Sequence, residues 1–294
     1  MHPSADSLSP SGGAEVSGER KGERPPLPEP LPAPAVDSHT HLDACGCVTA
    51  EDVAAAMDRA NSAGVARAIT VADDLAAARW AAEAATWDER VFAAVAIHPT
   101  RTSTFTDADR AELEKLAAQP KVVAIGETGL DYYWDYSPHD AQAEAFRWHI
   151  DLAKRVGKPL MIHDRDAHED ILRVLGEEGA PETVVFHCFS GDADFARRCL
   201  DAGYVLSFAG AVTFRNAKAL REAALLVPAE QLLVETDAPF LTPHPFRGRP
   251  NEPYCVAYTL RDLAELRGDD LAELAAATTA TAERVFRFQE VVAP

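Results

Sequence analysis

The sequence predicts a single α/β domain, a (β/α)8 TIM barrel that follows a disordered N-terminal tail. Short apolar runs rich in β-branched residues alternate with longer amphipathic, alanine-rich segments, which is the pattern of repeated βα units. Eight such units over about 260 residues suit a closed barrel better than a doubly wound sheet. The run 122–125 is wholly apolar, which indicates a strand buried on both faces, as in a parallel sheet.

Residues 1–34 are predicted to be the disordered tail, and residues 35–290 the barrel. The first segment is rich in Pro, Ser, Gly and Glu and ends in a proline-rich stretch, 25–34. Such a composition offers little apolar surface to bury, and it favours a solvated chain with a stiff, extended end. A ligand for an SH3-type domain is the functional alternative for this stretch.

From residue 35 onward the elements follow in a regular order. Strands are predicted at 35–41, 65–72, 91–97, 122–126, 159–163, 183–187, 204–208 and 232–235. Thr49 opens the first helix and Gly64 ends it, while Pro138 and Gly157 suit the first turn and the cap of a helix between them. Two further helices, at 252–266 and 269–288, are expected to pack outside the barrel after the last strand.

The charge balance restricts the possible substrates. The chain of 294 residues has a formal net charge of −19, which opposes the wrapping of long nucleic acid by a basic surface. A phosphate-bearing substrate would need local positive charge, which bound divalent cations can supply.

The cysteines and the hydropathy indicate a soluble, cytoplasmic protein. Five cysteines are an odd number for a disulfide framework and are widely spread, which favours reduced thiols. Cys45 and Cys47 lack the second pair that a zinc site needs. No apolar run approaches the roughly 18 residues of a membrane helix, and the first residues do not resemble a signal peptide. Nothing in the sequence indicates an obligate protein partner.

His39 and His41 are the first candidate metal ligands. Alternate side chains of a strand point the same way, so both imidazoles would face one space and could bind one ion. Taken alone, the pair is a weak signal, and two surface histidines near a strand end are the alternative.

Further ionisable residues occur at the carboxyl ends of other predicted strands, which converge at one mouth of a barrel where active sites of this fold lie. The complete candidate ligand set is His39, His41, Glu127, His163, His187 and Asp237. This set suits two divalent ions with open positions for water and substrate. Glu127 could bridge the ions, and Asp237 could bind metal and accept a proton from its water, which makes these two the candidate catalytic residues.

His98, Arg165 and Ser190 are the candidate substrate contacts. Arg165 and Ser190 follow the fifth and sixth strands on loops from which they could reach a phosphate. A solvated arginine is the alternative for Arg165, and a capped strand end before a proline is the alternative for His98.

Five strings of residues resemble the ordered motifs of the TatD family of metal-dependent deoxyribonucleases. They are DSHTHLD (37–43), GETGLDYY (126–133), IHDR (162–165), HCFSG (187–191) and ETDAPFL (235–241). The resemblance covers about residues 36–288 and implies a barrel of the amidohydrolase superfamily that hydrolyses DNA phosphodiester bonds, often as a 3′–5′ exonuclease. It also implies that His39 and His41 hold one ion, that His163 and His187 hold the other, and that Glu127 bridges them. Asp237 would then bind the first ion near the attacking water.

The predicted function is therefore a divalent-metal-dependent hydrolase in which a water activated by two metals cleaves DNA, preferably single strands or 3′ ends. The same paired metals could activate water against a carbonyl, so an amide, ester or aminoacyl-tRNA hydrolase is the alternative. A non-catalytic metal-binding scaffold is the third possibility. Imidazole suits zinc whereas carboxylate and water suit magnesium and manganese, so Mg, Mn and Zn all stay open.

Overall fold

The computed structural model describes residues 22–288, and in it eight parallel strands pair in the order of the sequence. The strands are β1 (Ala35–Thr40), β2 (Val65–Val71), β3 (Val91–Val95), β4 (Val122–Asp131), β5 (Leu160–Arg165), β6 (Val184–Phe186), β7 (Val205–Phe208) and β8 (Leu232–Val234). The segment after β8 returns to β1, where the Asp237 amide donates to the His39 carbonyl at 2.9 Å. This contact brings the last strand beside the first, and the predicted (β/α)8 barrel is confirmed.

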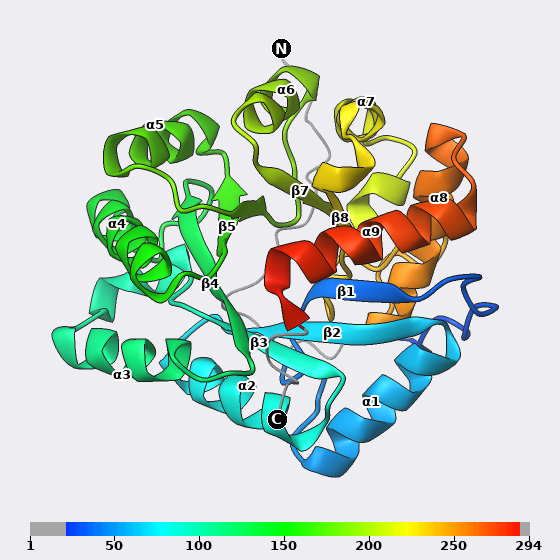
Figure 1. Ribbon diagram of the computed structural model, residues 1–294, viewed down its shortest axis with the longest axis horizontal. Coiled ribbons are helices and arrows are strands. Elements are labelled where there is room, and N and C mark those ends of the chain that lie inside the picture. The colour runs from blue at the N-terminus through cyan, green and yellow to red at the C-terminus, as the bar shows by residue number, and fades with distance from the viewer. Residues whose placement is uncertain (1–21, 289–294) are drawn as a thin grey trace.

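Helices surround the strands (Figure 1). They are α1 (Ala50–Ser62), α2 (Leu75–Trp87), α3 (Asp107–Ala117), α4 (His139–Val156), α5 (His168–Glu178), α6 (Ala193–Asp201), α7 (Lys218–Leu226), α8 (Val256–Arg267) and α9 (Leu271–Phe286), with 3-10 turns η1 (Pro99–Thr104), η2 (Gly210–Thr213), η3 (Ala229–Gln231) and η4 (Pro253–Cys255). As predicted, α1 begins after Thr49, which forms a capping box with Asp52, and α4 ends at Gly157 in the left-handed conformation.

The last helix packs against the interior of the barrel and closes one of its ends. Side chains from every strand form an interior apolar cluster, and Phe286 at the end of α9 belongs to it. Phe288 also belongs to this cluster, and its ring centroid lies 4.4 Å from that of Phe92 on β3. In Figure 1, α9 crosses the barrel near the centre of the view and does not join the outer ring of helices. The interior is thus a packed core, and the site must lie at the opposite, carboxyl end of the strands.

Strand β4 is longer than predicted, and a glycine explains how it continues. The sequence predicts an end at residue 126, whereas β4 pairs with β5 as far as Asp131. Gly129 has φ +144°, and a Cβ at this position would stand 2.0 Å from the carbonyl oxygen of His163. Only glycine allows the two strands to approach so closely beside a candidate ligand.

Part of the predicted tail, residues 22–34, packs against the barrel, contrary to the expectation of a tail without fixed structure. Pro25 and Leu31 are buried. The hydroxyl of Tyr254 donates to the Pro25 carbonyl, and the Leu31 amide donates to the Ala63 carbonyl at 3.0 Å. Proline-rich backbone makes few hydrogen bonds within itself, so its carbonyls are available to such donors. Residues 1–21 of the predicted tail lie outside the described part of the chain.

All five cysteines are free thiols. Among residues 22–288, no helix combines the length and apolar character needed to cross a bilayer.

A buried histidine of α4 holds the backbone that leads to His98. The Nδ1 atom of His149 lies 2.7 Å from the Ala145 carbonyl oxygen and donates to it, while Nε2 accepts from the Ile97 amide at 3.2 Å. Both nitrogens are therefore used by the neutral imidazole. Burial lowers the pKa of His149 to about 4.

We expect acid to destabilise the fold partly through His149. Because its folded pKa lies below the value of about 6.5 in an unfolded chain, protons bind preferentially to the unfolded state as the pH falls from 6.5 toward 4. The expected loss in free energy of unfolding is about 2–3 kcal/mol at pH 4.5. Urea unfolding in EDTA at a series of pH values gives the free energy of unfolding against pH for wild-type protein and for His149→Gln. The difference between these two curves is the contribution of His149. Parallel curves would contradict the assignment.

Candidate metal centre

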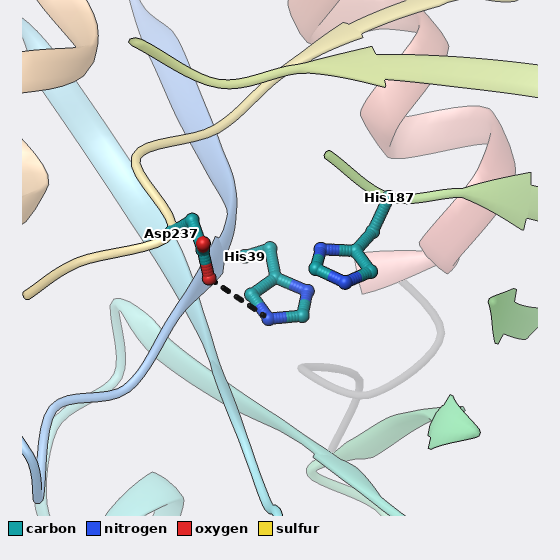
Figure 2. Close-up of side chains that lie close together, drawn as sticks. All are labelled: His39, His187 and Asp237. Carbon is teal, nitrogen blue, oxygen red and sulfur yellow. Dashed lines mark ion pairs between the residues drawn. The ribbon is translucent and has the colours of Figure 1, made fainter. Parts of the chain in front are cut away.

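Six predicted ligands meet at the carboxyl ends of the strands, and all of them are buried. His39 lies on β1, Glu127 on β4 and His163 on β5. His41 and His187 directly follow β1 and β6, and Asp237 lies three residues after the end of β8. Figure 2 shows three of them, with the rings of His39 and His187 side by side and Asp237 directed toward His39. Ring centroids of His39 and His187 are 3.9 Å apart and the planes differ by 12°. Side chains far apart in sequence thus form one cluster.

His39, His41, Glu127 and Asp237 form a first group. The two histidine Nε2 atoms are 3.2 Å apart, each lies 3.5 Å from Glu127 Oε1, and they lie 3.8 and 3.5 Å from Asp237 Oδ1. Ligands about 2.1 Å from a tetrahedral ion stand about 3.4 Å apart, so these separations fit one cation. Both carboxylate oxygens of Asp237 are buried without a hydrogen-bond partner, as expected of atoms that face a cation.

A second group surrounds the other oxygen of Glu127. Glu127 Oε2 lies 2.7 Å from His187 Nε2 and 3.2 Å from His163 Nδ1. His98 Nε2 joins this group, at 3.2 Å from His163 Nδ1 and 3.7 Å from Glu127 Oε2. The two oxygens of Glu127 therefore face different sets of imidazoles, which is the arrangement a bridging carboxylate requires.

His98 is buried within the ligand cluster and does not lie at the rim of the barrel mouth. Together with Glu127 and His163 it forms a group with ligand atoms close enough for one ion. Its Nδ1 accepts from the Thr100 amide at 3.2 Å, at the start of η1, which points Nε2 toward the cluster. The sequence prediction placed this residue at the mouth but gave it no place among the ligands.

Outer partners fix the orientation of three ligand rings. Asp131 Oδ2 lies 2.9 Å from His163 Nε2, and Glu235 Oε1 lies 3.2 Å from His187 Nδ1. His41 donates from Nδ1 to the carbonyl of Val71 at 2.9 Å. Such contacts select the tautomer and aim the other nitrogen at the metal. In each ring the second nitrogen is the one that faces the cluster.

Sequence reasoning assigned no role to Asp131 or Glu235, although both stand within the quoted motifs. For Asp131 a signal was available, since it lies four residues beyond Glu127 and alternate residues of a strand share a face. The prediction ended the strand at residue 126, so this periodicity was not applied.

Burial and neighbouring charges shift the pKa values of several residues in the cluster. Burial lowers the pKa of His39 to about 4. Burial also acts on His41, but nearby carboxylates, led by Asp73, outweigh it and raise its pKa to about 10. For Glu127, burial is outweighed by the surrounding histidines, led by His187, and its pKa stays well below the usual range. The carboxylate is therefore charged, and a bound cation would take the place of protons on the imidazoles.

Asp37 ties the last ligand to the first strand. Its carboxylate accepts from the Thr236 amide at 2.8 Å and from the Thr236 hydroxyl at 2.6 Å. Asp237 follows with φ +51°, in the left-handed region that non-glycine residues seldom adopt. Paired contacts to the preceding residue hold the backbone in this conformation, which directs the Asp237 carboxylate into the cluster.

A cavity beside the second group contains two of the predicted substrate contacts. His163 and His187 line it together with Arg165 and Ser190, and its remaining wall is largely apolar. The Arg165 guanidinium lies over the ring of Tyr133, 4.9 Å from its centroid. Arg165 and Ser190 therefore lie where a group bound to the metal centre would extend.

The chain is similar to several known proteins. The family model described as TatD related DNase matches residues 36–287. An uncharacterized metal-dependent hydrolase, TatD, from Mycobacterium tuberculosis is 60% identical over 257 residues, which cover 85% of this chain and 97% of that protein. The 3′-5′ ssDNA/RNA exonuclease TatD of Erwinia tasmaniensis is 39% identical over 197 residues, which cover 65% of this chain and 76% of its own.

Among solved structures, the TatD homolog YjjV from Escherichia coli superimposes with a TM-score of 0.80 at 30% identity. The match covers 86% of this chain and 98% of that chain. Sequence motifs, barrel architecture and family model agree over nearly the same residues, and the chain belongs to the TatD-related DNase family.

Proposed function

We propose that the protein hydrolyses phosphodiester bonds of single-stranded DNA from the 3′ end, with two divalent ions in the metal centre. The chain is a TatD-family metal-dependent hydrolase that acts on ester bonds. The observation that carries the more specific proposal is the position of Glu127, with one carboxylate oxygen facing each ligand group. The Erwinia tasmaniensis relative is a 3′-5′ ssDNA/RNA exonuclease by name, which supports the polarity and the single-stranded substrate.

Each residue of the centre is proposed to have a distinct task. His39, His41 and Asp237 hold the first ion, His163 and His187 hold the second, and Glu127 joins the two sites. Bound divalent ions would lower the pKa of water and neutralise charge on the phosphate. The carboxylate oxygens of Asp237 lie in the first group without a hydrogen-bond partner, and Asp237 is proposed to accept the proton that the attacking water gives up.

Cationic and polar side chains of the adjoining cavity are proposed to hold the substrate. Arg165 presents a planar guanidinium suited to the phosphate, and Ser190 adds a hydroxyl. His98 lies outside this cavity, with Nε2 3.2 Å from His163 Nδ1, and is proposed to contact the phosphate from there. The net charge of −19 opposes extended contacts with duplex backbone, so binding depends on these local groups and favours strand ends.

A metal series on a labelled single strand tests this proposal. After the protein is stripped with EDTA, addition of Mg²⁺, Mn²⁺ or Zn²⁺ is expected to restore stepwise shortening of a single-stranded oligonucleotide from its 3′ end. A 5′ label then reports a ladder of products, whereas a 3′ label reports release of mononucleotide. Mixed imidazole and carboxylate ligands accept several metals, so more than one of the three kinds of metal should support activity.

Other substrates in the same assay identify the alternatives. Covalently closed duplex should not be cut, and aminoacyl-tRNA, simple esters and cyclic amides should be hydrolysed far more slowly than the oligonucleotide. If a carbonyl substrate is turned over while the single strand stays intact with every metal, the nuclease proposal is wrong.

A further inference from the structure

Three aromatic side chains form a compact cluster in the loop between β4 and α4. The rings of Tyr133 and Trp134 meet edge to face with centroids 4.9 Å apart, and those of Trp134 and Tyr136 stack at 5.2 Å with planes 18° apart. Tyr133 is 43% exposed and Tyr136 is 45% exposed. They are the aromatic members of the small set of large apolar side chains exposed within residues 22–288. A core role does not account for rings that face solvent.

Asp131 fixes this aromatic loop to the metal centre. One of its carboxylate oxygens accepts from the amides of Tyr133 and Trp134, at 3.0 and 2.9 Å. The other lies 2.9 Å from His163 Nε2. A single carboxylate thus holds a candidate metal ligand and the start of the aromatic loop, so the rings keep a defined position relative to the centre.

Buried Gln142 of α4 closes the loop at its base. Its side-chain amide donates to the carbonyls of Asp131 and Ser137, both at 3.0 Å, and its oxygen accepts from the Asp131 amide at 2.8 Å. The Ser137 hydroxyl accepts from the Ser103 amide of η1 at 3.1 Å. Both ends of the loop are therefore tied to the fold, and the rings are presented on a preorganised support.

Arg165 connects the aromatic cluster with the cavity of the metal centre. Its guanidinium lies over the Tyr133 ring, and the same side chain lines the cavity beside His163 and His187. A chain that runs from the metal centre past Arg165 next meets exposed aromatic rings. A nucleic acid strand presents both phosphates and bases. The guanidinium suits a phosphate, and the aromatic faces suit the bases beside it.

We propose that Tyr133, Trp134 and Tyr136 form a stacking platform for the bases that precede the scissile 3′ end, with an intervening phosphate held by Arg165. This inference rests on the proposed function and adds the residues that select an unpaired strand. Every base has a π-face, so the platform accepts any sequence. Bases paired in a duplex cannot present these faces to the rings.

The length and base content of the substrate provide the test. For the wild-type protein, KM is expected to fall as a single strand is lengthened from two to about eight nucleotides. Tyr133→Ala and Tyr136→Ala should each raise KM for the long strand about tenfold, a size typical of a lost base–aromatic contact. Most of the loss should appear in KM and less in kcat. Tyr133→Phe and Tyr136→Phe keep the rings and should restore wild-type KM.

A matched abasic strand separates stacking from phosphate binding and from misfolding. The abasic octanucleotide keeps every phosphate but loses every base, so wild-type protein should bind it at least as weakly as each single alanine variant binds the normal strand. Circular dichroism and Tm confirm that each variant folds. If wild-type protein cleaves the normal strand with the same KM as the abasic strand, the platform is refuted while the nuclease proposal stands. If wild-type protein cleaves neither, the proposed function itself fails.

Discussion

Asp237→Asn is expected to lower kcat on a 3′-labelled single strand by about 10²–10⁴-fold, the range for loss of a general base. Asparagine has nearly the same shape but cannot accept the proton from the attacking water. Both oxygens of Asp237 are buried without hydrogen-bond partners, and Oδ1 lies 3.5 Å from His41 Nε2, so the substitution acts on the ligand cluster alone. The rate across a metal series, with contaminating nuclease excluded, measures the effect.

Stability provides a second readout for Asp237→Asn. The rise in Tm on addition of metal should become smaller than in wild-type protein, because the first group loses an anionic ligand. Asp262→Asn is a matched control, since Asp262 pairs with Arg221 away from the centre. Wild-type turnover by Asp237→Asn would exclude the proposed role.

Glu127→Gln is expected to affect both ions and to reduce the rate further. Glu127 is the carboxylate that contacts both groups, through Oε1 at His39 and His41 and through Oε2 at His163 and His187. Loss of several kcal/mol of stabilisation by metal corresponds to roughly a thousandfold or more in rate. Metal analysis should find less than one ion per chain, whereas Asp237→Asn should keep the second.

The comparison of the two variants is itself informative. Equal metal contents of about two ions in wild-type protein and Glu127→Gln would show that the carboxylate does not bridge. A wild-type content of one ion would contradict the two-metal proposal, whatever the rates. Glu127→Ala serves as a stricter control, since it removes the amide oxygen that could still weakly bind metal.

The sequence predicted the barrel well because its strands carry their own signal. Runs such as 122–125 are buried on both faces, so apolar character alone reveals them. The clustering of the candidate ligands could be predicted because strand ends converge in this architecture. The order of strands places His163 and His187 near His39 without any knowledge of distances.

Other features depended on tertiary contacts that periodicity does not encode. The extension of β4 passes through glycines that single-residue propensity treats as breakers, and it carries Asp131 to His163. The packing of residues 22–34 depends on donors such as Tyr254, more than two hundred residues away. The position of His98 follows from its role as the N-cap of η1, where its side chain accepts from the Thr100 amide. The rule that ligands lie at strand ends does not reveal this contact.

The hydrogen bonds between Asp37 and Thr236 join residues 199 positions apart, and they have a consequence for protein synthesis. A ribosome releases His39, His41, Glu127, His163 and His187 well before Asp237, so an unfinished polypeptide holds most of the ligands without the proposed proton acceptor. The first strand also lacks its last neighbour until β8 has emerged. The proposed centre therefore becomes complete only after β8 and Asp237 have emerged from the ribosome.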